Sequence, residues 1–159
     1  MRRPAEPGSI MTDATLTLVC PACGTINRIP AARVGASPRC GTCHAAIYTG
    51  HPVDVNAAGF DRHVKHDQVP VLVDVWAPWC GPCRTMEPTF IEAARRLDPA
   101  FRLLKLNADD APEILSRYGI RSIPTLLLFD HGLLRAQQAG AAPADRIVSW
   151  ARARSAATA

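Results

Sequence analysis

All of the cysteines in this chain of 159 residues fall into pairs whose two members are separated by two residues. The three pairs are Cys20/Cys23, Cys40/Cys43 and Cys80/Cys83. A thiolate is a nucleophile, a redox carrier and a ligand for soft metals, so this spacing allows either metal coordination or disulfide exchange. We see neither a secretion signal nor an apolar run long enough to cross a membrane. We therefore expect a cytoplasmic protein with no membrane partner, whose cysteines bind metal or catalyse redox chemistry.

The first two pairs have the spacing of a metal-binding ribbon, because 16 residues lie between Cys23 and Cys40. This spacing is typical of a structural zinc ion held by four thiolates in a tetrahedron. A unit of fewer than about 40 residues rarely folds without a metal or disulfides. We expect Gly24 and Gly41 to allow the tight turns that direct backbone N–H groups at the sulfurs. The expected ligands of one structural zinc ion are Cys20, Cys23, Cys40 and Cys43.

Other interpretations of this segment remain open at this stage. The four thiols could form two disulfides, or the segment could bind iron or no metal. His44 and His51 are nearby and could replace a thiolate, although four thiolates already complete a closed site.

The third pair lies between an expected strand over residues 70–77 and an expected helix over residues 81–97. A helix N-terminus favours an anion, so the pKa of Cys80 should be lowered. Cys83 is one helical turn further on, within reach of a disulfide. Pro82 suits the first turn of a helix. An exposed attacking thiol and a resolving thiol are what disulfide exchange requires. The alternative is that Cys80 and Cys83 form half of a second metal site. No further cysteine pair is left to complete such a site, because the other four cysteines already suffice for one metal ion.

The rest of the chain alternates strand and helix patterns. Further helices are expected over residues 57–66, 112–118 and 145–154, and further strands over residues 101–106, 125–129 and 133–138. This order predicts an α/β fold, a mixed sheet with helices on both faces. Composition changes near residue 50. We therefore expect a disordered extension over residues 1–14, a zinc-ribbon domain over 15–50 and a second domain over 53–155.

Several motifs together resemble the thioredoxin family. They are the strand 71–77, the stretch Trp79-Cys80-Gly81-Pro82-Cys83, the stretch Gly119-Ile120-Arg121-Ser122-Ile123-Pro124-Thr125, and Gly140. The four-cysteine ribbon that precedes them is similar to the bacterial thioredoxin 2 type. The resemblance implies a thioredoxin fold and a protein-disulfide reductase activity that proceeds through a mixed disulfide.

The resemblance also implies roles for single residues. Cys80 matches the nucleophile and Cys83 the resolving thiol. Asp74 matches a buried carboxylate behind the dithiol, supported by Lys105. Burial raises the pKa of a carboxyl group, which suits proton exchange near neutral pH. The alternative is a structural Asp74 paired with Lys105.

A substrate groove follows from the same resemblance. Its expected residues are Trp79, Gly81, Pro82, Ile123, Pro124 and Gly140. Pro124 matches a cis-proline that faces the dithiol and exposes backbone groups to a substrate peptide. The implied partners are an NADPH- and flavin-dependent thioredoxin reductase and disulfide-containing target proteins, with the protein itself a monomer.

Composition and charge limit the alternatives. With 48% apolar and 20% charged residues, the chain is globular in composition. Its net charge of +4 is not gathered in a basic run, so we expect no nucleic-acid partner. One alternative is a zinc-ribbon interaction module on a thioredoxin scaffold. Another is a redox-sensitive zinc site, whose oxidation would release the metal and alter the catalytic domain.

Overall fold

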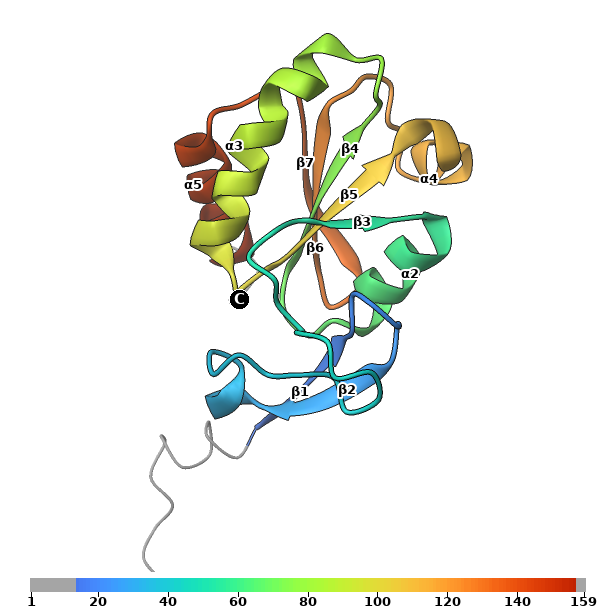
Figure 1. Ribbon diagram of the computed structural model, residues 1–159. Helices are drawn as coiled ribbons and strands as arrows, with labels where there is room; N and C mark the ends of the chain where they lie inside the picture. Colours follow the sequence, from blue (N-terminus) through green and yellow to red (C-terminus); the bar gives the residue numbers. More distant parts are fainter. Residues whose placement is uncertain (1–13, 157–159) are drawn as a thin grey trace, which may run out of the picture.

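The computed structural model describes residues 14–156 (Figure 1). The expected N-terminal extension lies outside the described residues except for residue 14. Within this part of the chain, the strands form one two-stranded and one five-stranded sheet. None of the described helices is both long enough and apolar enough to cross a membrane.

The N-terminal cysteine segment is built on a β-hairpin. Strand β1 (Thr15–Val19) pairs antiparallel with β2 (Ile26–Pro30), so that Leu16 lies opposite Ile29. A short 3-10 helix, η1 (Ala31–Arg33), follows β2. The apolar side chains of this segment form a cluster with two of the cysteines and with Val69. Val69 lies just before the strand Val71–Trp76, which belongs to the larger sheet. The ribbon therefore packs directly against the larger domain.

The main sheet has the strand order β3-β5-β4-β6-β7 in the described chain. The strands are β3 (Val53–Val55), β4 (Val71–Trp76), β5 (Arg102–Asn107), β6 (Thr125–Asp130) and β7 (Leu133–Ala139). Strands β3 and β4 run parallel to β5, and β6 runs antiparallel to both β4 and β7. Strand β4 lies at the centre with all residues but its last buried, as its nearly continuous apolar run predicts.

Helices cover both faces of this sheet (Figure 1). Helices α3 (Gly81–Leu97) and α5 (Ala144–Ala156) pack on one face around Phe90 and Ile147. Helices α2 (Ala57–His66) and α4 (Pro112–Arg117) pack on the other around Phe60 and Ile114. A second 3-10 helix, η2 (Ala108–Asp110), follows β5.

The structure confirms the predicted fold class, a mixed sheet with helices on both faces. Two predicted helices, 57–66 and 81–97, coincide with α2 and α3. Asn56 caps α2 as expected, since its side chain accepts a hydrogen bond from the Gly59 N–H. The other predicted helices and strands differ from the observed ones at their ends by one or two residues, where local pattern carries least information, and no range was predicted for β1, β2, β3 or the two 3-10 helices.

Buried charges join the ribbon to the sheet, which the sequence did not indicate. Arg102, at the start of β5, donates hydrogen bonds to the carbonyl oxygens of Ile47 at 2.7 Å and Val19 at 2.9 Å. It also pairs with the Asp67 carboxylate at 3.3 Å. Asp67 in turn accepts from the Val19 N–H and lies 2.6 Å from the His63 ring nitrogen. This cluster satisfies charges that would otherwise be costly to bury.

We expect Arg102→Leu to destabilise the protein strongly. The substitution leaves Asp67 buried without its cationic partner and orphans two ribbon carbonyls. Breaking a buried ion pair by removing one partner costs about 3–5 kcal/mol. Urea denaturation followed by tryptophan fluorescence measures the change. Arg135→Leu, at an exposed position of β7, is the control and should stay within about 0.5 kcal/mol of the parent. Equal stability of the two variants would contradict the role of Arg102.

Candidate active site and metal centre

The third cysteine pair lies where β4 leads into α3. Cys80 is the N-cap residue of α3, and its sulfur accepts a hydrogen bond from the Cys83 N–H at 3.2 Å. The two cysteines are joined in a disulfide, with their Cα atoms 5.3 Å apart. Pro82 occupies the first turn of the helix, as predicted. The backbone therefore holds both sulfurs within bonding distance at a helix N-terminus, where an anionic sulfur is stabilised.

The expectation of an exposed attacking cysteine is not met, since Cys80 is only 4% exposed. Ala77 and Cys83 pack against it, with Trp76 and Ile123 alongside. The preceding Trp79 is instead 69% exposed. The exposed surface next to the dithiol is therefore provided by Trp79 and not by the Cys80 sulfur.

The loop that faces Cys80 is formed by Ile123 and Pro124. The peptide bond between these two residues is cis, and the Ile123 carbonyl oxygen lies 3.7 Å from the Cys80 sulfur. The Pro124 carbonyl accepts a hydrogen bond from the Gly140 N–H at 2.8 Å. Gly140 has φ of +100°, which only glycine adopts readily, while a side chain there would meet open space. Backbone conformation, and not close packing, explains the glycine.

A hollow of about 370 Å³ opens beside Trp79. Of the expected groove residues, Trp79 and Ile123 line it, whereas Gly81, Pro82, Pro124 and Gly140 do not. Asp109 fixes the indole, accepting hydrogen bonds from Trp79 Nε1 at 3.0 and 3.1 Å. Asp109 is distant in sequence from Trp79, and no local pattern pointed to it.

Asp74 lies buried in β4, the strand that leads to the dithiol. Its Oδ1 atom has no hydrogen-bond partner among the described residues. Burial raises the pKa of Asp74 to about 7, although the nearby Lys105 charge lowers it and Glu87 raises it further. A carboxyl group with this pKa can take up or release a proton at neutral pH.

Lys105 lies opposite Asp74 in the register of β4 and β5, but no ion pair joins the two within the described chain. The Lys105 ammonium instead pairs with Glu87 at 3.2 Å and lies 4.4 Å from the centre of the Trp76 ring. Glu87 is one turn beyond Cys83 on α3, and the sequence reasoning did not single it out. Glu87 thus pairs with the Lys105 ammonium, and its own negative charge raises the pKa of Asp74.

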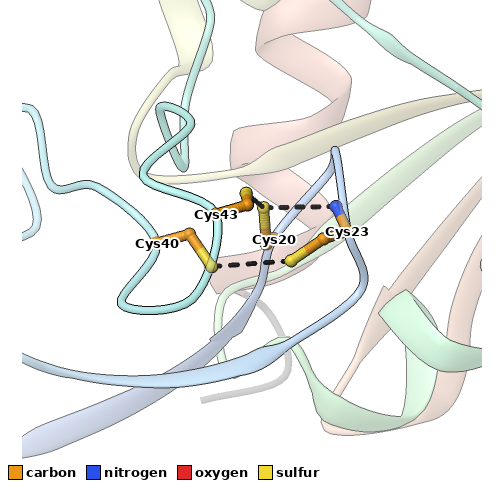
Figure 2. Close-up of side chains that lie close together, drawn as sticks. All are labelled: Cys20, Cys23, Cys40 and Cys43. Atoms are coloured by element: carbon orange, nitrogen blue, oxygen red, sulfur yellow. Dashed lines mark hydrogen bonds between the residues drawn. The ribbon is translucent and has the colours of Figure 1, made fainter.

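The first two cysteine pairs converge on one point (Figure 2). The four sulfur atoms lie within 4.8 Å of one another, and two sulfur pairs are 3.6 Å apart. Sulfur–metal bonds of about 2.3 Å at tetrahedral angles place the sulfurs about 3.8 Å apart. The distances thus suit a tetrahedral metal ion and are too long for a disulfide. These residues fit a metal, with Cys20, Cys23, Cys40 and Cys43 as its ligands.

The two metal-binding turns have matching backbones. In the first, the N–H groups of Ala22 and Cys23 point at the Cys20 sulfur. In the second, the Thr42 N–H points at the Cys40 sulfur. Each turn ends on a residue with positive φ directly after its second cysteine.

Those two residues are Gly24 at +79° and His44 at +64°. Gly41 lies in the second turn as expected, but it has no positive φ, so the turn does not depend on the conformational freedom of that glycine. His44 completes that turn through its backbone, as Gly24 does in the first.

The pKa values of two of the clustered thiols indicate that a bound cation would stabilise their thiolate forms. The Cys43 N–H and the Asn27 side chain lower the pKa of Cys40 to about 5. In Cys43 the backbone hydrogen bond of Ala45 lowers the pKa, but desolvation and the neighbouring cysteines raise it to about 12. Negative charge on one sulfur thus opposes ionisation of the next, and a bound cation removes that conflict.

Comparison with known proteins agrees with this geometry. Residues 51–153 match the family model described as Thioredoxin, and residues 19–45 match the one described as Thioredoxin 2, N-terminal. The chain belongs to the thioredoxin family. Members of this family are thiol–disulfide oxidoreductases, and the Cys80–Cys83 pair gives this thioredoxin the same chemistry. The N-terminal match places it with the thioredoxin 2 type.

Individual relatives show how far the likeness extends. Thioredoxin C-3 of Corynebacterium nephridii is 33% identical over 85% of this chain and 92% of its own length. Thioredoxin 1 of a Nostoc species is 45% identical over 56% of this chain and 83% of its own. In structure, a mutant thioredoxin from Halobacterium salinarum aligns with a TM-score of 0.61 and 28% identity, over 67% of this chain and 93% of that one.

We expect Asp74→Asn to stabilise the oxidised protein at high pH. The folded state holds a proton on Asp74 up to a pKa of about 7, whereas the unfolded carboxyl group releases it near 3.8. Stability from this group is therefore present below the lower value and lost as the pH rises to the higher one. Asparagine does not ionise, so the variant keeps this stability at high pH. Its free energy of unfolding should exceed that of the parent by roughly 2–4 kcal/mol at about pH 8 and by little at about pH 4.

Urea denaturation at both pH values measures this difference. Asp54→Asn is the matched control, because it removes an exposed carboxylate from β3, which lies on the other side of β5 from Asp74. A parent protein whose stability does not fall between the two pH values would show that Asp74 ionises normally.

Proposed function

We propose that this thioredoxin reduces protein disulfides with Cys80 as nucleophile and Cys83 as resolving thiol. The observation that supports this most directly is the disulfide between them at the N-terminus of α3. The helix terminus favours the Cys80 thiolate, and the Cys83 N–H already points at its sulfur at 3.2 Å. The Gly81-Pro82 dipeptide resembles that of reducing members of the family.

In the proposed reaction, the Cys80 thiolate attacks one sulfur of a target disulfide. A bond forms between Cys80 and that sulfur, and the other target sulfur leaves as a thiolate that takes up a proton. Cys83 then loses its proton and attacks the Cys80 sulfur. This step forms the Cys80–Cys83 disulfide and releases the second target thiol, so two electrons pass to the target.

Asp74 would accept the proton of Cys83 in the second step. Its buried carboxylate and pKa of about 7 suit this role, and Lys105 supports it through its charge. A target peptide would lie across Trp79, Gly81, Pro82, Ile123, Pro124 and Gly140. The Ile123–Pro124 loop beside the Cys80 sulfur would pair with its backbone.

The cycle requires a source of electrons for the oxidised dithiol. We propose an NADPH- and flavin-dependent thioredoxin reductase for this step, the kind of partner that the family generally uses. The targets are proteins with accessible disulfides, and the protein acts as a monomer. A reducing compartment such as the cytoplasm suits the ribbon, because its four thiols must stay reduced to bind metal.

We further propose that the metal is one zinc ion and that the site is redox-sensitive. Four thiolates in a closed tetrahedral set leave no open position for catalysis, which suits a structural zinc. Cys23 and Cys43 are exposed while Cys20 and Cys40 are buried. An oxidant can thus reach the outer two sulfurs, oxidise them and weaken the hold on the ion.

We expect Cys80→Ser to abolish the reduction of insulin disulfides in the presence of a thioredoxin reductase and NADPH. Cys83→Ser should also stop turnover, but it should accumulate a covalent complex, because the mixed disulfide then forms and cannot be resolved. Mass spectrometry of the non-reduced protein detects this complex.

The difference between the two variants is the sharp test of the assigned roles. A complex on Cys80→Ser but not on Cys83→Ser would reverse them. Full turnover in either variant would refute the dithiol mechanism.

We expect the reduced native protein to contain one zinc per chain and two rapidly titrated thiols. Cys40→Ser should lose the zinc and raise the number of titrated thiols from two to five, because the three remaining ribbon thiols are no longer bound to metal. Peroxide should oxidise pairs of ribbon thiolates to disulfides, itself reduced to water, and release the ion to a colorimetric chelator. Metal analysis and thiol titration measure these quantities. A metal-free native protein, or zinc that remains bound after its ligands are oxidised, would contradict the assignment.

A further inference from the structure

The ribbon carries a second hollow, of about 440 Å³, which none of the metal-binding cysteines lines. It lies between β2 and the loop that returns toward the second metal-binding turn. Its lining residues are Arg28, Ile29, Pro30, Arg33, Ala36, Ser37, Pro38 and Arg39. We call this hollow the ribbon groove.

The ribbon groove is strongly cationic. Its three arginines are exposed, and they come together although they are spread along the segment in the sequence. Residues 15–50 contain no Asp or Glu. Over the part of the chain that the structure describes, none of the three arginines takes part in an ion pair, and only Arg39 has a fixed acceptor, the His44 carbonyl. Unneutralised guanidinium groups around one hollow favour an anionic ligand.

The groove also runs along a free strand edge. Three consecutive residues of β2 line it. Because the side chains of a strand alternate between its two faces, a hollow on one face would be lined by every second residue only. The hollow therefore follows the edge of the strand. The Ala31 N–H donates to the Ala14 carbonyl. Because hydrogen-bonded positions alternate in an antiparallel ladder, Ile29 then points its backbone groups at β1 and Arg28 points them away.

The opposite strand confirms this alternation. Thr17 pairs with Arg28 in the register of the hairpin. Its own backbone groups point away from β2, since they bond with Gln68. No described residue bonds with the outward N–H and C=O of Arg28. A free edge of this kind is a template for an added strand.

We propose that the ribbon groove binds an extended acidic segment of a partner protein, which adds as a strand to the edge of β2. Carboxylates of the segment would pair with Arg28, Arg33 and Arg39. Its alternate apolar side chains would rest on Pro30 and Pro38. A nucleic acid fits less well, because the groove has no aromatic residue for base stacking and only three cations.

The groove can be occupied without blocking the dithiol. Val69, just before β4, belongs to the apolar cluster of the ribbon, whereas Cys80 follows the far end of β4. The ribbon and the start of α3 accordingly lie at opposite ends of the molecule (Figure 1). A partner held on the ribbon would leave Cys80 free, and its own disulfides would meet the dithiol at a raised effective concentration.

Fluorescence anisotropy of a labelled peptide of about eight alternating glutamates and valines tests the proposal on the full-length, zinc-loaded protein. We expect saturable binding that weakens with salt, and about tenfold weaker binding for Arg28→Glu and for Arg33→Glu. Arg135→Glu, an exposed arginine on β7, should bind like the parent. Unchanged zinc content and insulin reduction would show that each variant is folded.

Two further measurements separate the proposal from its rivals. Binding should slow hydrogen exchange at the Arg28 amide, since an added strand would bond to it. Failure of the peptide to bind, equal weakening in Arg135→Glu, or unchanged exchange at Arg28 would overturn the proposal. So would tighter binding of a single-stranded oligothymidine of the same charge, which would identify a nucleic-acid surface instead.

Discussion

The buried guanidinium of Arg102 anchors the ribbon on the sheet. Arg102 reaches from β5 to the carbonyl oxygens of Val19 and Ile47, and its positive charge is balanced by Asp67. Its guanidinium also lies 4.7 Å from the centre of the Tyr48 ring. A buried charge tolerates no loss of its partners, so these contacts hold together or fail together. The ribbon is thus packed on the end of the sheet and is not an independent domain joined to it only by a linker.

Strand β5 carries this anchor and also a second cation, which influences Asp74. Lys105 lies three residues after Arg102 on β5, opposite Asp74. Arg102 contacts the ribbon, whereas Lys105 lies opposite Asp74 in the register and pairs with Glu87. Glu87 competes for Lys105, so the proton affinity of Asp74 depends on how the ammonium is shared. The register of β5 between its neighbours therefore affects both the position of the ribbon on the sheet and the charges close to Asp74.

The sequence reasoning succeeded where one short segment contains the whole signal. Cys-x-x-Cys spacing, the apolar run of β4 and the capped helix α2 are complete within a few residues each, and the structure has them. It failed where the partners are far apart in the chain. Arg102 and Val19 are separated by 83 positions, and nothing near either one indicates the other. The low exposure of Cys80 has the same origin, because Ile123 packs beside it from a distant loop.

The same Cys-x-x-Cys step serves two chemistries because of the backbone that follows it. After Cys23 and Cys43 the chain turns through positive φ, at Gly24 and His44, and the N–H groups of each turn close on its own first sulfur. That turn leaves the second sulfur free to face the other pair, at a distance that suits a tetrahedral metal ion. After Cys83 the chain instead continues as helix α3 to Leu97. The helix brings both sulfurs of one pair together, so they bond with each other and can exchange with a third.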